Sequence, residues 1–392
     1  MLKRHDSTIQ PNRTVTMPHH PVIASAAWRS IASWIATSLT LVAMPLAALT
    51  IPAMLGAVFA QTIAPSDTQQ VLKVGPQRAI QTLSAAAQLA RAGAIIEVDA
   101  GVYVADVAVW PQDDITIRAA GGRVRLVAQG ASAEGKAIWV VRANRMRVEG
   151  FDFEGAAVPD RNGAGIRLEK GSLFLRDCRF RYNEMGLLTG NDPDTVLEIE
   201  NSEFAYNQRP DGHNHNLYVG QIAQLLVKGS YFHHGHIGHL LKSRAAVSQI
   251  YNNRLIDGED GTASYELEFP NGGMAYVVGN TIAQSTLTEN TILISFGAEG
   301  YKWPRNEIHS ENNTLVNPLP SGGVYLRVRP GADRIRAVSN RLVGPGRLES
   351  AGHGEYRDNV SVDPRDYARS LNNAKHNLGI MDRHGLRPRD DN

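Results

Sequence analysis

The sequence predicts an all-β protein, a single-stranded right-handed parallel β-helix solenoid with an N-terminal capping helix. The main observation is a short pattern that returns along the chain: an apolar residue, two or three small or polar residues, and then Phe, Leu or Ile. Its copies recur every 23 to 33 residues, and a period of about 20–50 residues is typical of solenoids. The last residues of the copies, here called markers, are Phe153, Phe180, Phe204, Phe232, Leu255, Ile282, Leu315 and Leu342.

A second short strand follows the markers after a polar turn, as in GIRLEKG from Gly165 and YELEF from Tyr265. These segments alternate apolar and polar residues and show no helical stripe. Each coil therefore holds at least two strands, and strands stacked coil on coil run parallel to one another. A right-handed course follows by analogy with the crossover rule for parallel strands.

The residue two positions before each marker is polar in several coils. This recurrence predicts a ladder of stacked side chains at one corner of the coil. Asparagine holds this position in four consecutive coils, at Asn253, Asn280, Asn313 and Asn340. Serine holds it in two earlier coils, at Ser202 and Ser230. Because a side-chain amide both donates and accepts hydrogen bonds, we expect each amide to bond the next one.

Residues 1–60 are predicted to be a signal peptide. A basic and polar segment precedes an uncharged run from Ile31 to Pro65, and Val58-Phe59-Ala60 is a small-residue cleavage pattern. An uncleaved membrane anchor is the alternative, because about 20 apolar residues span a bilayer. We expect an extracytoplasmic protein, periplasmic or secreted, with a leader over residues 61–75 and no membrane segment after cleavage.

The charge balance argues against nucleic acid as a partner. The formal net charge is +1, and removal of residues 1–60 takes away four basic residues and one acidic residue.

The single cysteine, Cys178, cannot form an internal disulfide and fits a buried core thiol. We expect a monomer whose partner is a polysaccharide.

The β-helix domain is predicted over residues 76–361, followed by a C-terminal cap and tail over residues 362–392. It opens with a capping helix that starts at Pro76 and is ended by Gly93, and the strand IIEVDAGVY follows. A helix over the open end covers exposed strand edges. This helix and strand resemble the opening of proteins in the pectate-lyase-like superfamily. The resemblance covers roughly residues 74–345 and implies the same fold.

Alternation along the strands separates inward from outward side chains. In YELEF, Tyr265, Leu267 and Phe269 are predicted to point inward, which places Glu266 and Glu268 outside.

The neighbouring coils add Tyr218, Lys242 and Arg327 to the same outer face. Since neighbouring strands lie about 4.8 Å apart, we expect one groove lined by an aromatic residue, a base, two acids and an arginine. A solvated, charged face without a function is the alternative.

Histidines gather in the turns before two of these strands, DGHNHN from Asp211 and HHGHIGH from His233. We expect His215 and His239 at the edge of the groove, where a histidine can act as acid or base near neutral pH. Such a cluster can also bind zinc or another transition metal, and the acidic turn DGEDG from Asp257 can bind calcium. The sequence requires no cofactor, and we assign no metal ligands.

The Lys242 coil resembles that of the alginate lyase and chondroitinase B group, through Lys242-Ser243 on an outward strand and Asn253-Arg254 completing the coil. In that group the lysine is the base and an arginine one coil later assists. Here Glu268 stands in the place of that arginine, and LYVG at 217–220 lacks the acidic calcium ligands of the group. The resemblance therefore implies a role for Lys242 alone.

A polysaccharide lyase acting on a uronic-acid polymer is the favoured function. Lys242 or His239 would remove the α-proton, and Tyr218 or His215 would protonate the leaving oxygen. An arginine would bind the carboxylate through its planar fork. The candidates for this substrate-binding role are Arg327, Arg329 and Arg244.

Two other functions remain open. A glycoside hydrolase would use Glu266 and Glu268, whose carboxyls would lie about 6.5–7 Å apart if they point to the same face, within the inverting range. A non-catalytic glycan-binding or surface protein would use the same groove without chemistry.

Overall fold

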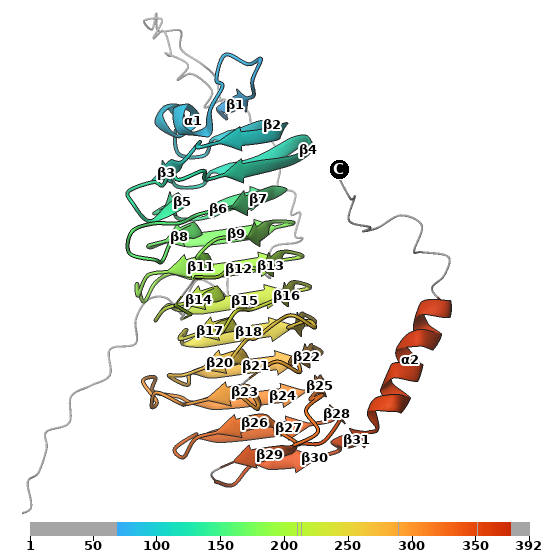
Figure 1. The fold of residues 1–392 in the computed structure, drawn as a ribbon. Coiled ribbons are helices and arrows are strands. Elements are labelled where there is room, and N and C mark those ends of the chain that lie inside the picture. Colours follow the sequence, from blue (N-terminus) through green and yellow to red (C-terminus); the bar gives the residue numbers. More distant parts are fainter. Residues whose placement is uncertain (1–68, 210, 213, 289, 351, 378–392) are drawn as a thin grey trace, which may run out of the picture. The chain divides into compact units, whose positions relative to one another are not determined.

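A computed structural model describes residues 69–377, apart from residues 210, 213, 289 and 351. The predicted signal peptide, residues 1–60, lies outside this range. The described chain forms a parallel β-solenoid of about 10 turns, which confirms the predicted right-handed parallel β-helix. Figure 1 shows the coils stacked from a short helix at one end to the last strands at the other. Within the described residues, none of the helices has the length and apolar character needed to span a bilayer.

The first sheet is a ladder of 10 strands, one from each coil, and it carries the candidate site. Each strand pairs in parallel with the strand of the coil before and after it. Its strands are β3 (Ala108–Trp110), β5 (Ala137–Val141), β8 (Ala164–Leu168), β11 (Met185–Thr189), β14 (His215–Val219), β17 (His239–Ser243), β20 (Tyr265–Phe269), β23 (Ile292–Phe296), β26 (Val324–Val328) and β29 (Arg347–Ser350).

The second sheet forms another wall of the coils and begins one strand earlier than predicted. Within the expected leader, residues 71–74 form a strand that pairs with the first strand of the domain. The strands of this sheet are β1 (Val71–Val74), β2 (Ile95–Val104), β4 (Thr116–Val127), β6 (Met146–Glu149), β9 (Ser172–Arg176), β12 (Val196–Glu200), β15 (Gln224–Lys228), β18 (Val247–Tyr251), β21 (Met274–Val278), β24 (Glu307–Glu311), β27 (Arg334–Val338) and β30 (Glu355–Arg357).

The third sheet holds the markers and is continuous with the second through the long strands β2 and β4. Its own strands are β7 (Phe151–Glu154), β10 (Arg179–Arg181), β13 (Glu203–Ala205), β16 (Tyr231–His233), β19 (Arg254–Ile256), β22 (Thr281–Ala283), β25 (Thr314–Val316), β28 (Arg341–Val343) and β31 (Val360–Val362). Three strands per coil, rather than the minimum of two inferred from the sequence, thus enclose the interior.

The markers pair with one another from coil to coil, as the repeat predicts. Phe153, Phe180, Phe204 and Phe232 are fully buried and stack face to face. Their ring centroids lie 4.9, 4.6 and 4.8 Å apart. The spacing equals the strand separation, so one apolar column fills the interior beneath the third sheet.

The predicted asparagine ladder is confirmed. Asn280 Oδ1 accepts from Asn253 N at 2.8 Å and from Asn253 Nδ2 at 3.1 Å, and Asn280 Nδ2 donates to Ile250 O at 2.8 Å. Asn313 and Asn340 repeat this pattern in the following coils. The row satisfies buried backbone amides at the corner between the second and third sheets.

A left-handed turn residue precedes each rung of the ladder. Asn252, Asn312 and Asp358 adopt φ of 55°, 54° and 58°, and Gly279 adopts 72°. Asn, Asp and Gly tolerate this region better than other residues, which explains the recurring NN, GN and DN pairs of the sequence.

Two helices flank the stack of coils. The helix α1 (Leu83–Leu89) begins at its cap Thr82, whose side chain accepts from Ala85 N at 3.1 Å. It is therefore shorter than the helix predicted from Pro76. At the other end, α2 (Pro364–Asn377) lies within the predicted C-terminal cap, and its Tyr367 ring lies under the guanidinium of Arg341 at 5.7 Å.

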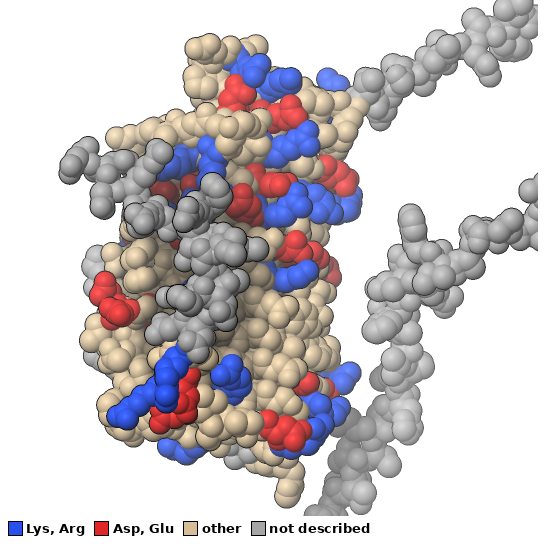
Figure 2. Space-filling view, turned by 90° about the vertical axis from the view of Figure 1, so that its right-hand side faces the viewer, with Lys and Arg blue, Asp and Glu red and all other residues tan. Residues whose placement is uncertain are grey.

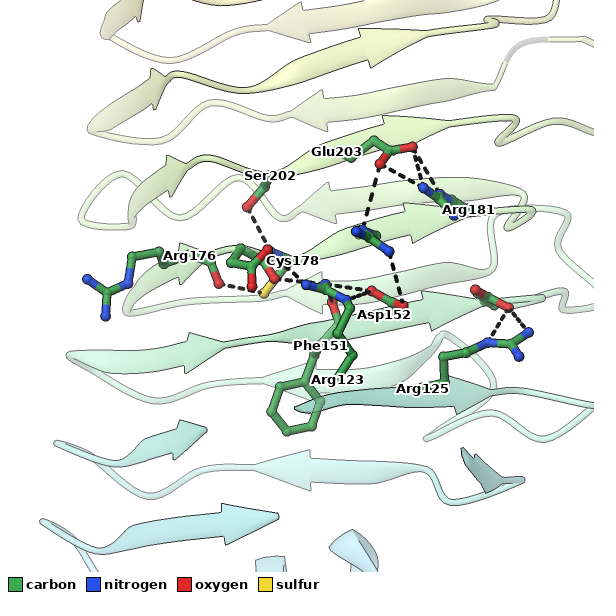
Figure 3. Close-up of polar contacts among 12 residues, drawn as sticks. Arg123, Arg125, Phe151, Asp152, Arg176, Cys178, Arg181, Ser202 and Glu203 are labelled. Carbon is green, nitrogen blue, oxygen red and sulfur yellow. Dashed lines mark hydrogen bonds and ion pairs between the residues drawn. The ribbon is translucent and has the colours of Figure 1, made fainter. Parts of the chain in front are cut away.

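Charged side chains on the outer face of the third sheet are paired across coils. Figure 2 shows basic and acidic side chains lying beside one another over one face of the molecule. In the close-up, Arg123 contacts Asp152 at 2.6 Å, and Arg181 contacts Glu203 at 2.6 Å (Figure 3). Such pairs neutralise each other locally and leave little free charge for a ligand.

Cys178 occupies the ladder position one coil before Ser202, and its backbone N–H donates to Ser202 Oγ at 3.1 Å (Figure 3). Burial raises the pKa of its thiol to about 12. The thiol is thus part of the core, as the sequence predicts, and is unsuited to nucleophilic chemistry.

Candidate functional site

One outer row of the first sheet brings three of the predicted residues together. Strand pairing sets Tyr218 of β14 opposite Lys242 of β17, and Lys242 opposite Glu268 of β20. The row continues through Ser295 of β23 to Arg327 of β26. Four of the five residues of the predicted stripe therefore share this line of the sheet, and the fifth, Glu266, does not.

Lys242 is the centre of an ion cluster. Its Nζ lies 3.0 Å from Glu268 Oε2 and 3.1 Å from Glu299 Oε1. The contact with Glu268 is a close ion pair. The Lys242 side chain is 12% exposed and that of Glu268 is 4% exposed, so this pair is well shielded from water.

Arg244 completes the cluster from the end of β17. It donates to both carboxylate oxygens of Glu299, at 2.7 and 2.6 Å, and to the Tyr218 hydroxyl at 2.9 Å. Its guanidinium carbon also lies 5.2 Å from the centre of the Tyr218 ring. Two cations thus hold one carboxylate, and the Tyr218 hydroxyl is bonded to one of these cations, Arg244.

Glu299 belongs to a loop over residues 297–306 that sequence reasoning did not assign to the site. The loop follows β23, and the 33-residue step between Ile282 and Leu315, the longest in the repeat, is the signal that it exists. Trp303 Nε1 donates to Arg244 O at 3.1 Å, and Glu299 N donates to Pro270 O at 2.9 Å. The loop is therefore anchored directly beside the cluster.

The pKa values of the two glutamates move in opposite directions. Burial raises the pKa of Glu268, and the contact with Lys242 offsets part of this effect. Burial also acts to raise the pKa of Glu299, but hydrogen bonds from Arg244 and Lys242 outweigh it and lower the pKa. Opposite shifts of this kind are typical of carboxyls with different tasks.

His215 and His239 lie beside the cluster on the first residues of β14 and β17. His239 N donates to His215 Nδ1 at 3.1 Å, and His239 Nδ1 lies 3.2 Å from Glu268 Oε2. Burial lowers the pKa of His239 well below its usual value, and nearby His215 and Lys242 add to this effect. The imidazole of His239 is therefore neutral near pH 7.

Glu266 does not point outward, which corrects the sequence prediction. It is 1% exposed, and neither carboxyl oxygen has a hydrogen-bond partner among the described residues. Its place in β20 corresponds to Leu240 in β17, where Leu240 and Leu241 are both fully buried in the core. Two consecutive residues face inward at this point, so strict alternation fails at the start of the strand.

Burial and the carboxylate of Asp257 raise the pKa of Glu266 well above its usual value. Asp257 is itself buried and accepts from Gly235 N at 2.7 Å and Ala263 N at 2.8 Å. The first carboxylate of the acidic turn that could bind calcium therefore bonds backbone amides inside the coil. Across the described part of the chain, no group of three or more His, Cys, Asp or Glu is arranged to hold a metal ion.

Arg327 and Arg329 lie three coils from Lys242, away from the ion cluster. Arg327 Nε contacts Glu349 Oε2 at 2.5 Å and lines a cavity of about 680 Å³ together with Tyr265 and His236. Arg329 is exposed. Of the three arginines considered for substrate binding, only Arg244 joins the cluster.

A scan against protein-family models found no match, and neither did a search of curated proteins. Among solved structures, pectate lyase Pel9A is similar over 74% of this chain and 80% of its own, with 12% identity and a TM-score of 0.45. A pectin methylesterase from Aspergillus niger is similar over 76% and 91%, with 11% identity and a TM-score of 0.36. The chain's own strand register is what defines it as a parallel β-helix.

Proposed function

We propose that the protein is a polysaccharide lyase that acts on a polymer containing uronic acids. The observation that carries this proposal is the convergence of Lys242 and Arg244 on one carboxylate at the outer face of the first sheet, with the Tyr218 hydroxyl bonded to Arg244. β-Elimination next to a carboxylate requires a cation that neutralises it, a base and an acid. These chemical groups are all present within the cluster and the adjoining histidines.

Arg244 and Lys242 would neutralise the substrate carboxylate, which makes the neighbouring α-carbon more acidic. His239 would take the α-proton, because its neutral imidazole offers an electron pair near pH 7. The electron pair of the broken C–H bond forms the double bond to the β-carbon as the C–O bond breaks. Tyr218 would then give its hydroxyl proton to the leaving oxygen.

Lys242 is the other candidate for the base, and Lys242→Arg separates the two assignments. Arginine keeps a positive charge and does not release its proton in proteins. A variant that keeps measurable lyase activity supports a purely cationic role for Lys242 and leaves His239 as the base. A variant as inactive as Lys242→Ala supports Lys242 as the base.

A glycoside hydrolase is the second candidate, now with Glu268 and Glu299 in place of the Glu266–Glu268 pair. The raised pKa of Glu268 suits a general acid, and the lowered pKa of Glu299 suits a nucleophile or base. Each carboxylate has an oxygen near 3 Å from Lys242 Nζ, at 3.0 and 3.1 Å, so these two oxygens are at most about 6 Å apart. This upper limit is compatible with the separation of about 5–5.5 Å between the carboxyl groups of retaining enzymes.

The deciding experiment incubates the purified protein with polyuronates such as pectate, alginate and glucuronan. A lyase produces both ultraviolet absorbance and new reducing ends, whereas a hydrolase produces reducing ends alone. Lys242→Ala should abolish the absorbance signal, while Lys228→Ala, which removes an exposed lysine of the second sheet, should not. Binding of a polymer without either product would identify a glycan-binding protein and overturn the enzyme proposal.

We also infer an extracytoplasmic location, since polymeric substrates of this kind lie outside the cytoplasm. The small-residue pattern Val58-Phe59-Ala60 within the uncharged run supports cleavage after Ala60. Mass spectrometry of the exported protein should find the mature N-terminus near Gln61, and an intact N-terminus would indicate an anchor instead.

A further inference from the structure

We propose that Arg244 and Lys242 form a subsite for a carboxylate of the ligand, and that Glu299 of the protein itself occupies this subsite when no ligand is bound. A uronate carboxylate must then displace Glu299 to bind. The identity of the ligand as a uronate rests on the proposed function, whereas the occupied subsite rests on the contacts of the three side chains.

The contacts of Glu299 are those that a free carboxylate would make. Arg244 Nη2 donates to both of its oxygens, at 2.7 and 2.6 Å, and Lys242 Nζ lies 3.1 Å from one of them. Charge-assisted hydrogen bonds from a guanidinium to a carboxylate are short and strong, and the ammonium of Lys242 adds a second positive charge. A hexuronate presents the same planar group of two oxygens and one negative charge.

The cations would stay in place after Glu299 leaves. Lys242 keeps its contact with Glu268 at 3.0 Å, and Arg244 keeps its hydrogen bond to Tyr218 at 2.9 Å. Trp303 additionally holds the backbone oxygen of Arg244. The subsite is therefore pre-organised, and little ordering of protein groups opposes ligand binding.

Among the three side chains of the subsite, Glu299 is the most exposed and can rotate into solvent. Its side chain is 44% exposed, compared with 12% for Lys242 and 16% for Arg244. Its backbone N–H is bonded to Pro270 O at 2.9 Å, so the displacement requires rotation of the side chain and not opening of the loop. Side-chain rotation into solvent is fast compared with loop opening.

An internal competitor lowers the apparent affinity by the fraction of molecules in which the subsite is open. If Glu299 fills the subsite in about nine of ten molecules, its removal should increase carboxylate affinity about tenfold. The gain should apply only to anionic sugars, since a neutral sugar does not compete for the cations.

The test measures calorimetric binding of galacturonate, glucuronate and mannuronate, which have no glycosidic bond to cleave, and of neutral galactose. Glu299→Gln and Glu299→Ala should bind at least one uronate about tenfold more tightly than the wild type, with galactose unchanged. Glu349→Gln is the matched control, because it removes a carboxylate that pairs with Arg327 on the same sheet. It should bind like the wild type, and Arg244→Gln should lose the uronate affinity.

Equal uronate affinity in the wild type and both Glu299 variants, or no uronate binding in any of them, would overturn the subsite. Thermal unfolding of each variant checks that the fold is retained. Activity is read separately: tighter uronate binding without absorbance-producing cleavage supports the subsite and counts against the lyase. Tighter binding together with loss of hydrolysis in Glu299→Gln identifies Glu299 as a hydrolase carboxylate as well.

Discussion

Two rows of side chains run along the coils, and they differ in how they follow the repeat. The inner row places Asn253, Asn280, Asn313 and Asn340 at one corner, with the same hydrogen bonds at each step. The outer row of the first sheet changes from coil to coil, from Tyr218 through Lys242 to Glu268 and then Ser295.

We infer from this difference that the inner row contributes to stability and the outer row to chemistry. An asparagine of the inner row bonds the equivalent backbone groups in every coil. It therefore contributes to stability by holding neighbouring coils together. Lys242 occurs in one coil only, so it is not needed to stack the coils. It pairs instead with Glu299, which lies on the extra loop. The predictions below test whether this separation holds, starting with the largest expected effect.

Replacing Lys242 with Met, which keeps the length of the side chain, should reduce turnover on the substrate by about 10³-fold or more. The free energy of unfolding should fall by about 1–3 kcal/mol, because Glu268 loses its partner in a shielded place. The cost is larger than expected for an open surface lysine. Initial rates and chemical denaturation measure the two effects.

The companion variant Lys242→Met/Glu268→Gln should recover part of the stability without recovering turnover. Recovery of turnover in the double variant would show that Lys242 only neutralises Glu268, and the outer row would then not be a catalytic row.

Replacing Asn280 with Ala should lower the free energy of unfolding by about 3 kcal/mol. The substitution leaves Asn253 N and Ile250 O buried without their partners. Urea denaturation measures the loss, and the rate per folded molecule should stay that of the wild type. A loss below about 0.5 kcal/mol would mean that neighbouring rungs or water replace the amide.

The buried carboxyls of Glu266 and Asp257 should make the free energy of unfolding depend on pH. Burial raises the pKa of Glu266 well above its usual value and that of Asp257 to about 6, so folding favours the protonated forms. This contribution is complete below about pH 4, the pKa range of unfolded carboxyls. It is lost as the pH rises through about 6 and beyond, by at most about 1.4 kcal/mol per pH unit for each proton.

Denaturation of the wild type and of Glu266→Gln between pH 4 and pH 8 measures this effect. The variant should show a flatter decline of stability with rising pH, since one of two coupled carboxyls is gone. Identical slopes would place the origin of the pH dependence elsewhere.

Replacing Glu203 with Gln on the outer face of the third sheet should have the smallest effect, about 1 kcal/mol or less. Burial acts to raise the pKa of Glu203, but contacts with His233 and Arg181 outweigh it and lower the pKa to about 2. The stability from this carboxylate is therefore lost as the pH falls from about 4 toward 2. Turnover at neutral pH should not change, and a large loss would extend the functional surface to the third sheet.

The fold could be predicted from the sequence because equivalent residues recur at the same place in each coil. The markers and the asparagines recur at a nearly constant interval, so their phase alone predicts that Phe180 stacks on Phe204 and Asn280 bonds Asn313. The ladder also extends further than its asparagines, since Ser202 N donates to Ser230 Oγ, and Asn340 N donates to Asn359 Oδ1.

The site was predicted only in part, for two physical reasons. The alternation of inward and outward side chains holds in the middle of a strand. It failed at Glu266, because two successive residues face inward near the start of β20. Pattern analysis also treats loops as spacers, so it could not bring Glu299 to Arg244, 55 positions earlier in the sequence. The extra length of that coil was visible, but the partner of the loop depends on the three-dimensional stacking.

The asparagine row has a direction that bears on how the protein is synthesised. Each new asparagine binds back onto the finished coil before it: Asn280 accepts from Asn253 N and Nδ2 and donates to Ile250 O. A chain leaving the ribosome from its N-terminus can therefore complete one rung with every coil that emerges. Only the newest rung waits for its successor, so a chain that folds coil by coil in this order carries a single unfinished edge at each step.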